Sequence, residues 1–162
     1  MKTLSLFFLL LFQAYFPQDL GAIRKEFILA SKDRESASAL MDQLSTITEA
    51  DKKVLVAYKG AVMALMAKYT KENQERKRLF REGVQLLEYA VSEAPDNIEI
   101  RCLRLSIQEN TPKFLKYRSN IGDDKSFILT NYKNTPSLAV KDFVRSYIMQ
   151  SDGFNTGEKQ GL

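Results

Sequence analysis

Four polar residues near the middle of the chain have a spacing that could bind an anion. They fall within the stretch APDNIEIRCLRLSIQENTP and are Asn97, Arg101, Arg104 and Gln108. On a helix these residues form one polar line, because residues three and four positions apart share a face. Two guanidinium groups one turn apart can hold a carboxylate or a phosphate through paired hydrogen bonds. The pattern therefore indicates a candidate binding site for a small anionic ligand.

The same arginines could instead join neighbouring helices inside the protein. A helix with neighbours on both sides has little free surface, and buried arginines are normally paired with acids. The acids available for such pairing are Glu93, Glu109, Asp123 and Asp124. We favour this structural interpretation and keep the anion site as the alternative. An Arg104→Ala variant with an unchanged melting temperature would exclude the structural interpretation.

The residue inventory argues against an enzyme. The chain has 162 residues and no histidine, which removes the commonest general base and the usual metal-binding imidazole. No aspartate or glutamate stands in an apolar stretch of the kind that perturbs a catalytic carboxyl group. The sequence also has no glycine-rich phosphate loop, no clustered metal ligands and no calcium loop. We expect no catalytic residue, metal or cofactor, and keep a histidine-free all-α enzyme as an alternative.

The charge of the chain is only mildly basic, with a net value of +4. Its most basic stretch is KENQERKRLFRE, residues 71–82, which could touch phosphates or an acidic membrane surface. Glutamates interleave with the cations, and Arg78 can pair with Glu82 four residues on. We interpret this stretch as a solvated helix face and expect no nucleic-acid partner.

The two ends of the chain differ in character from the middle. Residues 1–18 contain one cation, Lys2, followed by an apolar run that is too short to span a membrane, which is the layout of a signal peptide. Its end could fall anywhere between residues 14 and 22. We therefore expect a periplasmic or secreted protein without stable membrane insertion after signal removal. Residues 151–162 offer little to bury and predict a flexible tail.

Residues 19–150 carry apolar side chains at helical spacing, which predicts a single all-α domain. The strongest segment, 48–69, has a second stripe made only of small residues: Ala57, Gly60, Ala64 and Ala67. Small side chains let another helix approach closely, so we expect this segment to be packed on two sides. The lone cysteine, Cys102, cannot form an internal disulfide and is expected to be a small core residue.

The stretch from Ala94 to Pro112 has two possible secondary structures. Ile98, Ile100 and Cys102 alternate with polar neighbours, as they would in a half-buried strand. No second convincing strand exists to pair with it, and an isolated strand is unstable. We therefore predict a helix that begins after the stop at Pro95.

Short polar signals predict where the helices begin. Ser31 or Asp33 could cap the second helix, and Thr48 with Asp51 resembles a capping box before the third. In the second half, Thr111 and Thr135 each stand before a proline, a combination that favours the first turn of a helix. A further helix around Phe127 would be capped by one of the acids just before it. These acids are Asp123 and Asp124.

Helices joined in pairs by short turns suggest a helical repeat. Gly83, Leu87, Ala90 and Pro95 resemble the small, large, small and proline positions in the second helix of a tetratricopeptide repeat. The segment YTKENQERKR departs from that family by making the turn about ten residues too long. The chain as a whole also resembles small exported helical proteins of Bacteroidetes-type bacteria, most distinctively at AYKGA and NIEIRCLRLSIQENTPKFL.

The tetratricopeptide resemblance implies a short solenoid of antiparallel helical hairpins with one concave face. Such faces usually bind a peptide or a partner protein. We therefore predict a non-enzymatic, exported protein- or peptide-interaction module of the cell envelope. Its partner would lie on the surface lined by the third and fifth main helices. The alternatives are a carrier of a small anionic ligand bound by Arg101 and Arg104, and the histidine-free enzyme.

Overall fold

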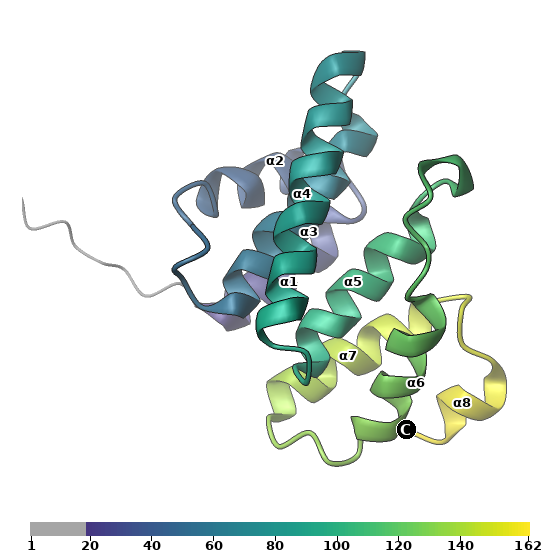
Figure 1. Cartoon of the computed structure of the whole chain (residues 1–162). Helices are drawn as coiled ribbons and strands as arrows, with labels where there is room; N and C mark the ends of the chain where they lie inside the picture. The colour runs from purple at the N-terminus through teal and green to yellow at the C-terminus, as the bar shows by residue number, and fades with distance from the viewer. Residues whose placement is uncertain (1–18) are drawn as a thin grey trace, which may run out of the picture.

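The computed structural model describes residues 19–162, and the regular elements of this range are all helical (Figure 1). This confirms the predicted all-α class. The predicted signal peptide, residues 1–18, lies outside the described residues. The elements are α1 (Leu20–Ala30), α2 (Arg34–Gln43), α3 (Lys53–Tyr69), α4 (Asn73–Glu93), α5 (Ile98–Asn110), the short 3-10 turn η1 (Lys113–Leu115), α6 (Ile121–Asn131), α7 (Leu138–Gln150) and α8 (Thr156–Gln160).

Helices α3 and α4 form the tightest pair in the molecule, and two glycines make their approach possible. A Cβ atom added to Gly60 would lie 2.6 Å from the backbone oxygen of Gly83, and one added to Gly83 would lie 2.6 Å from that of Gly60. The two backbones therefore touch where they cross, as the stripe of small residues predicts. Any larger residue at either position would push the helices apart.

The turn between these helices is short, which corrects the prediction of an extended turn. α3 ends at Tyr69, and α4 begins at Asn73. The carboxylate of Glu72 accepts hydrogen bonds from the backbone N–H groups of Gln74 and Glu75, so it starts α4 at once. The additional residues extend α4 by turns that reach past its partner helix (Figure 1).

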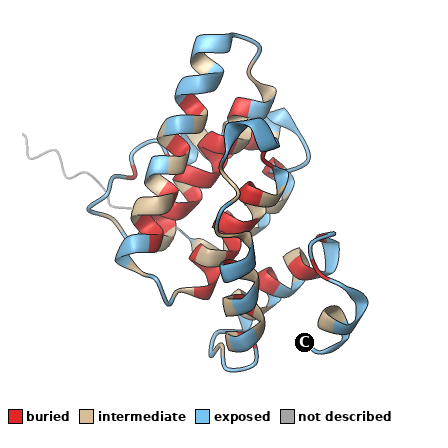
Figure 2. Ribbon diagram, turned by 45° about the vertical axis from the view of Figure 1, so that its right-hand side comes forward, coloured by how far each residue is buried: buried red, intermediate tan, exposed pale blue. Residues whose placement is uncertain are grey.

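Helices α3 and α5 lie at the centre of the fold. α3 contacts α1, α2, α4 and α5, whereas α5 contacts α3, α4, α6 and α7. Nine of the thirteen residues of α5 are buried, and Figure 2 shows buried residues concentrated along these central helices. The rings of Phe27 in α1, Tyr58 in α3 and Phe143 in α7 pack together, with centroids 5.5–6.4 Å apart. These three rings link the two halves of the chain.

Several helix starts agree with the sequence. Asp33 caps α2 by accepting a hydrogen bond from the Ser36 N–H at 2.8 Å. Asn97 caps α5 through hydrogen bonds from the Glu99 and Ile100 N–H groups, and this confirms a helix in the stretch that could also be read as a strand. Each cap satisfies donors that the first turn of a helix leaves without partners.

The predicted capping box at Thr48 does not begin a helix. The Asp51 carboxylate accepts hydrogen bonds from the N–H and the hydroxyl of Thr48, but α3 starts only at Lys53. The contact therefore closes a turn that precedes the helix. Thr48 and Asp51 supply the bonds of half a capping box without the helical backbone that would complete it.

The prediction that Thr111 and Thr135, each followed by proline, begin the next helix is also wrong. The hydroxyls of Thr111 and Thr135 each donate to the carbonyl four residues earlier, so both close the helix that precedes them. α7 is capped instead by Ser137. α6 begins at Ile121, before the acids predicted to cap it, which leaves Asp124 in its first turn.

The C-terminal segment is packed, unlike the flexible tail that the sequence predicts. Phe154 is only 3% exposed and meets the ring of Tyr147 edge to face. Beyond it, Asn155 and Glu158 form a complete capping box for α8, and Glu158 pairs with Lys125 of α6 at 2.9 Å. A buried aromatic ring and an ion pair to α6 thus hold a largely polar segment against the body.

Candidate functional site

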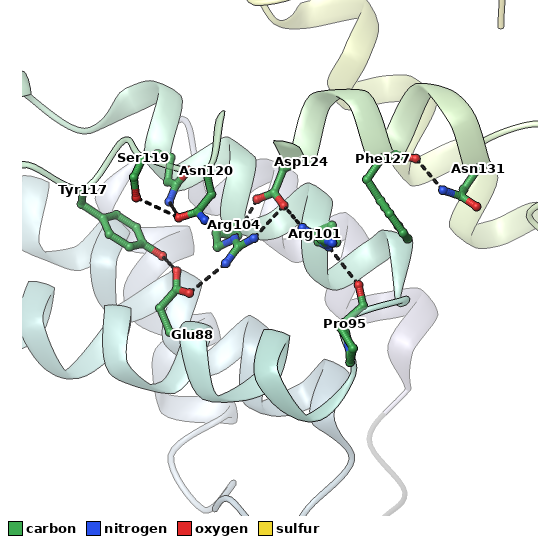
Figure 3. A network of polar contacts seen from close by, with 11 residues as sticks. Glu88, Pro95, Arg101, Arg104, Tyr117, Ser119, Asn120, Asp124, Phe127 and Asn131 are labelled. Atoms are coloured by element: carbon green, nitrogen blue, oxygen red, sulfur yellow. Dashed lines mark hydrogen bonds and ion pairs between the residues drawn. The ribbon is translucent and has the colours of Figure 1, made fainter. Parts of the chain in front are cut away.

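The predicted polar line on α5 lies against α4 and α6 and contacts acids from both (Figure 3). Asp124, in the first turn of α6, is fully buried, and Glu88 of α4 is partly exposed. Together with Arg101, Arg104 and Tyr117 these two acids form a connected group, called here the Asp124 cluster. Asp124 is one of the acids predicted as partners of the arginines, whereas Glu88 is not among them.

Arg104 is the centre of the Asp124 cluster. Its guanidinium group donates two hydrogen bonds of 2.7 Å to the carboxylate of Asp124 and one of 2.8 Å to Glu88. The arginine is 4% exposed. Burial opposes its charge, but the hydrogen bonds and charges of Asp124 and Glu88 outweigh that effect, so the pKa of Arg104 is raised above its ordinary value.

Arg101 lies one turn earlier and shares the same carboxylate. It donates to Asp124 at 2.6 Å and to the carbonyl of Pro95 at 2.9 Å. Its guanidinium group also stacks over the ring of Phe127, 4.5 Å from the centroid. One buried carboxylate therefore holds two arginines, and the pair joins the end of α4, α5 and α6.

Tyr117 completes the cluster from the loop that precedes α6. Its hydroxyl donates to Glu88 at 2.5 Å, and its ring packs edge to face on Phe80 of α4. Burial, followed by the hydrogen bond and charge of Glu88, raises the pKa of Tyr117 above its ordinary value. Glu88 is thus held between an arginine and a tyrosine.

The other two predicted site residues have separate structural contacts. Asn97 uses its side chain as the cap of α5. Gln108 is fully buried and donates to the side-chain oxygen of Asn120 at 3.3 Å. Of the four residues, the structure thus brings together Arg101 and Arg104 on one carboxylate, whereas Asn97 and Gln108 bond elsewhere. This arrangement favours the structural interpretation of the arginine line.

A second buried charge cluster lies on the opposite side of α5, and the sequence analysis missed it. Glu99 is 3% exposed and accepts two hydrogen bonds from Arg24 of α1, at 2.8 and 2.9 Å. The hydroxyl of Tyr58 donates to the same carboxylate at 2.7 Å. Burial, and then the charge of Glu99, raises the pKa of Tyr58 above its ordinary value. These three residues are called here the Glu99 cluster.

Both clusters correct the expectation that no acid lies in an apolar setting. Glu99 and Asp124 are buried among the core helices, but each is neutralised by an arginine. A paired carboxylate is poorly suited to act as a general acid or base, because its charge is already committed to a partner. Burial also raises the pKa of the Cys102 thiol well above its ordinary value, in agreement with the predicted core role.

One concave feature of the described residues is a groove of about 540 Å³. It lies between α1, α3, α5 and α7, and is called here the α1–α7 groove. Phe27, Ile107 and Phe143 form a buried apolar floor. The polar side chains at its surface are Ser31, Lys68, Asn110, Gln150 and Asp152. The groove has the mixed lining of a binding surface rather than a convergent set of reactive groups.

One wall of the groove is stiffened by Glu109. Its carboxylate accepts hydrogen bonds from the hydroxyls of Tyr147 and Ser151, the latter at 2.7 Å. Burial, followed by the contact with Glu109, raises the pKa of Tyr147 above its ordinary value. A Cβ atom at Gly153 would collide with a carboxylate oxygen of Glu109, so a larger residue there would displace that side chain. These contacts fix the segment after α7 along the edge of the groove.

The two helices predicted to line the partner surface, α3 and α5, are accessible only in part. Most of α3 and α5 is covered by other helices. Their C-terminal halves do reach the α1–α7 groove, through Leu65 and Lys68 of α3 and Ser106 and Asn110 of α5. The groove is therefore one place where both helices are accessible, although Lys59 of α3 and Arg101 of α5 are partly exposed outside it.

Within residues 19–162, no group of three or more potential metal ligands comes together. No helix of the described part of the chain is both long enough and apolar enough to cross a membrane. Comparisons with protein-family models, curated proteins and solved structures found no match. The resemblances to tetratricopeptide repeats and to exported Bacteroidetes-type proteins therefore remain predictions from the sequence.

Proposed function

We propose that this chain is a non-enzymatic, exported interaction module that holds an extended segment of a partner protein in the α1–α7 groove. The observation that carries the proposal is the groove itself, an open concavity with an apolar floor and a polar edge. Such a lining can take an apolar side chain of a peptide while the edge bonds its backbone.

The packing order of the helices supports a short solenoid of helical hairpins. Consecutive helices pair as α1 with α2, α3 with α4, and α5 with α6. The first helices of these pairs also contact one another in order, α1 with α3 and α3 with α5, and α7 continues the series by contacting α5. In a solenoid this pattern places the first helices along one face, which is where the groove lies.

The state of the reactive side chains supports binding over catalysis. The buried acids Glu99 and Asp124 are engaged by arginines, and one carboxylate oxygen of Glu109 accepts hydrogen bonds from two hydroxyl groups. The anion-carrier alternative gains no support, because the guanidinium groups of Arg101 and Arg104 are already bonded to carboxylates of the chain. The partner segment is therefore the occupant to test.

Photocrosslinking in the producing cell tests the groove directly. A photoreactive amino acid at Ser106 would lie in the groove, and the same residue at Leu138, which is 76% exposed and outside it, serves as the matched control. We expect one discrete protein adduct from position 106, absent from position 138, and its loss in a Leu65→Glu background. A Leu138→Glu background should leave the adduct unchanged.

The alternatives predict different outcomes of that experiment. Equal labelling from both positions, or none from position 106, would contradict the groove as a partner site. A small molecule that remains bound during native mass spectrometry, with no protein adduct, would favour the carrier. Export is tested separately: the protein should be recovered outside the cytoplasm with its N-terminus between residues 15 and 23. Recovery of the intact chain in the cytoplasm would contradict export.

A further inference from the structure

The turn between α5 and α6 exposes an apolar pair between two cations. Residues 112–116, PKFLK, are all exposed and are called here the 112–116 tip. Phe114 is 79% exposed, more than any other large apolar side chain of the described residues, and Leu115 is 41% exposed. Lys113 and Lys116 flank them, and the tip contains no acid. A single exposed phenylalanine can be incidental, so its support and its neighbours decide the interpretation.

The tip is held rigidly from both sides. On one side the hydroxyl of Thr111 donates to the carbonyl of Ile107 at 2.7 Å. On the other side Arg118 donates to three carbonyl groups at the end of α5, and Tyr117 is anchored to Glu88. Lys116 turns the backbone with a φ of 54°, which is a left-handed conformation. Because the turn is fixed at both ends, it presents Phe114 outward in a defined position.

Helix α4 brings further cations to the same side. Phe80 and Glu88 contact Tyr117 at the base of the turn. Lys77 and Arg81 are exposed and lie on the same helical face as Glu88, eleven and seven residues before it. Among the described residues, no acid forms an ion pair with Lys77, Arg81, Lys113 or Lys116. The basic stretch of α4 is thus connected, through Phe80 and Tyr117, to the turn that carries the exposed aromatic side chain of Phe114.

We propose that the 112–116 tip docks the protein on a bilayer surface that contains anionic lipid headgroups. Phe114 and Leu115 would enter the boundary between the headgroups and the acyl chains. Lys113 and Lys116, with Lys77 and Arg81 behind them, would pair with the phosphates around that point. A narrow, convex tip with apolar residues at its apex and cations around it complements a soft, negatively charged plane. It offers little area to a rigid protein partner, whose interface would have to be several times broader.

A single tryptophan reports on the tip without interference, because the chain contains no tryptophan. The variant Phe114→Trp is made in the full chain and purified after export, and its emission is recorded with phosphatidylglycerol–phosphatidylcholine vesicles. We expect a blue shift, and quenching by brominated acyl chains, with these anionic vesicles at low salt. The control Leu138→Trp carries its reporter at a comparably exposed site away from the tip and should not shift.

Two further variants separate the charge from the apolar pair. Lys113→Glu combined with Lys116→Glu, in the Phe114→Trp chain, should abolish the shift with anionic vesicles. In a flotation assay without reporter, Phe114→Ala should lower the vesicle-bound fraction about tenfold or more, because one buried aromatic side chain is removed. All variants share one N-terminus, so any contribution of the first residues cancels.

Three results would overturn the proposal. The first is an unchanged Phe114→Trp emission with anionic vesicles while the protein remains folded by circular dichroism. The second is an equal shift with pure phosphatidylcholine, which would remove the role of the cations. The third is a shift that appears only with a lipid-free protein extract, which would make the tip a protein-docking element instead. None of these results depends on whether the α1–α7 groove binds a peptide.

Discussion

The two charge clusters on opposite sides of α5 each neutralise a buried carboxylate, but they do so with different numbers of partners. In the Asp124 cluster one fully buried carboxylate forms ion pairs with two arginines. A second acid, the partly exposed Glu88, also pairs with Arg104. In the Glu99 cluster a single arginine, Arg24, meets a single carboxylate and a tyrosine. Buried ion pairs add little net stability, yet removal of one partner is costly because a charge is left without water. The cost should therefore scale with the number of charges left behind.

The Asp124 cluster should give the largest effect. Asp124→Ala leaves two guanidinium groups near the core with only Glu88 to oppose them, and we expect a loss of about 3–5 kcal/mol in the free energy of unfolding. Urea unfolding followed by circular dichroism measures it. Asp123→Ala is the matched control, because this neighbour is exposed in the same first turn of α6. A loss below about 1 kcal/mol for Asp124→Ala would reopen the view that the arginines await an external anion.

The Glu99 cluster should give a smaller loss. Glu99→Gln leaves the guanidinium group of Arg24 without its charged partner. Because the Arg24 side chain is 13% exposed, water can solvate part of its charge. We expect a loss of about 2–3 kcal/mol by the same measurement. Glu93→Gln, an exposed acid near the end of α4, should change stability by less than about 0.5 kcal/mol. If Glu99→Gln cost more than Asp124→Ala, the number of stranded charges would not be the controlling factor.

The same contrast explains which parts of the site the sequence could predict. The spacing of Arg101 and Arg104 is a local property of one helix, and Asp124 follows in the next helix, so a bridge between neighbours could be anticipated. Glu99 and Arg24 lie 75 positions apart, and nothing in either local pattern points to the other. Glu88 could not be predicted as a partner, because helical periodicity identifies a face but cannot show which neighbour covers it.

Helix content was predictable for a similar reason, whereas some of the helix boundaries and the packing of the last segment were not. The stripe of small residues predicts that another helix approaches closely at Gly60, and the structure shows that this helix is α4, which meets it at Gly83. A threonine before a proline can close one helix or open the next, and Thr111 and Thr135 both close the helix before them. Phe154 is one aromatic residue in a polar segment, and its burial depends on the edge of α7, which lies elsewhere in the fold.

The last prediction uses the two tyrosines to compare the clusters at alkaline pH. Tyr58 and Tyr117 each donate to a carboxylate, and burial together with that acid holds the pKa of each above its ordinary value. In the unfolded chain both ionise near pH 10. Their contribution to stability is therefore complete below about pH 10 and is lost as the pH rises further, because the unfolded chain releases protons that the folded chain keeps.

Each tyrosine should steepen the loss of stability by about 1.4 kcal/mol per pH unit above pH 10. Tyr58→Phe and Tyr117→Phe should each remove that much from the slope, measured by urea unfolding between pH 9 and pH 11. Lysines titrate in the same range, but they are common to all three proteins and cancel in the comparison. At pH 7 the two variants should differ in their free energy of unfolding, because Tyr58 is fully buried whereas Tyr117 bonds to the partly exposed Glu88. An unchanged slope in Tyr58→Phe would show that the buried hydroxyl releases its proton as readily in the folded chain as in the unfolded one.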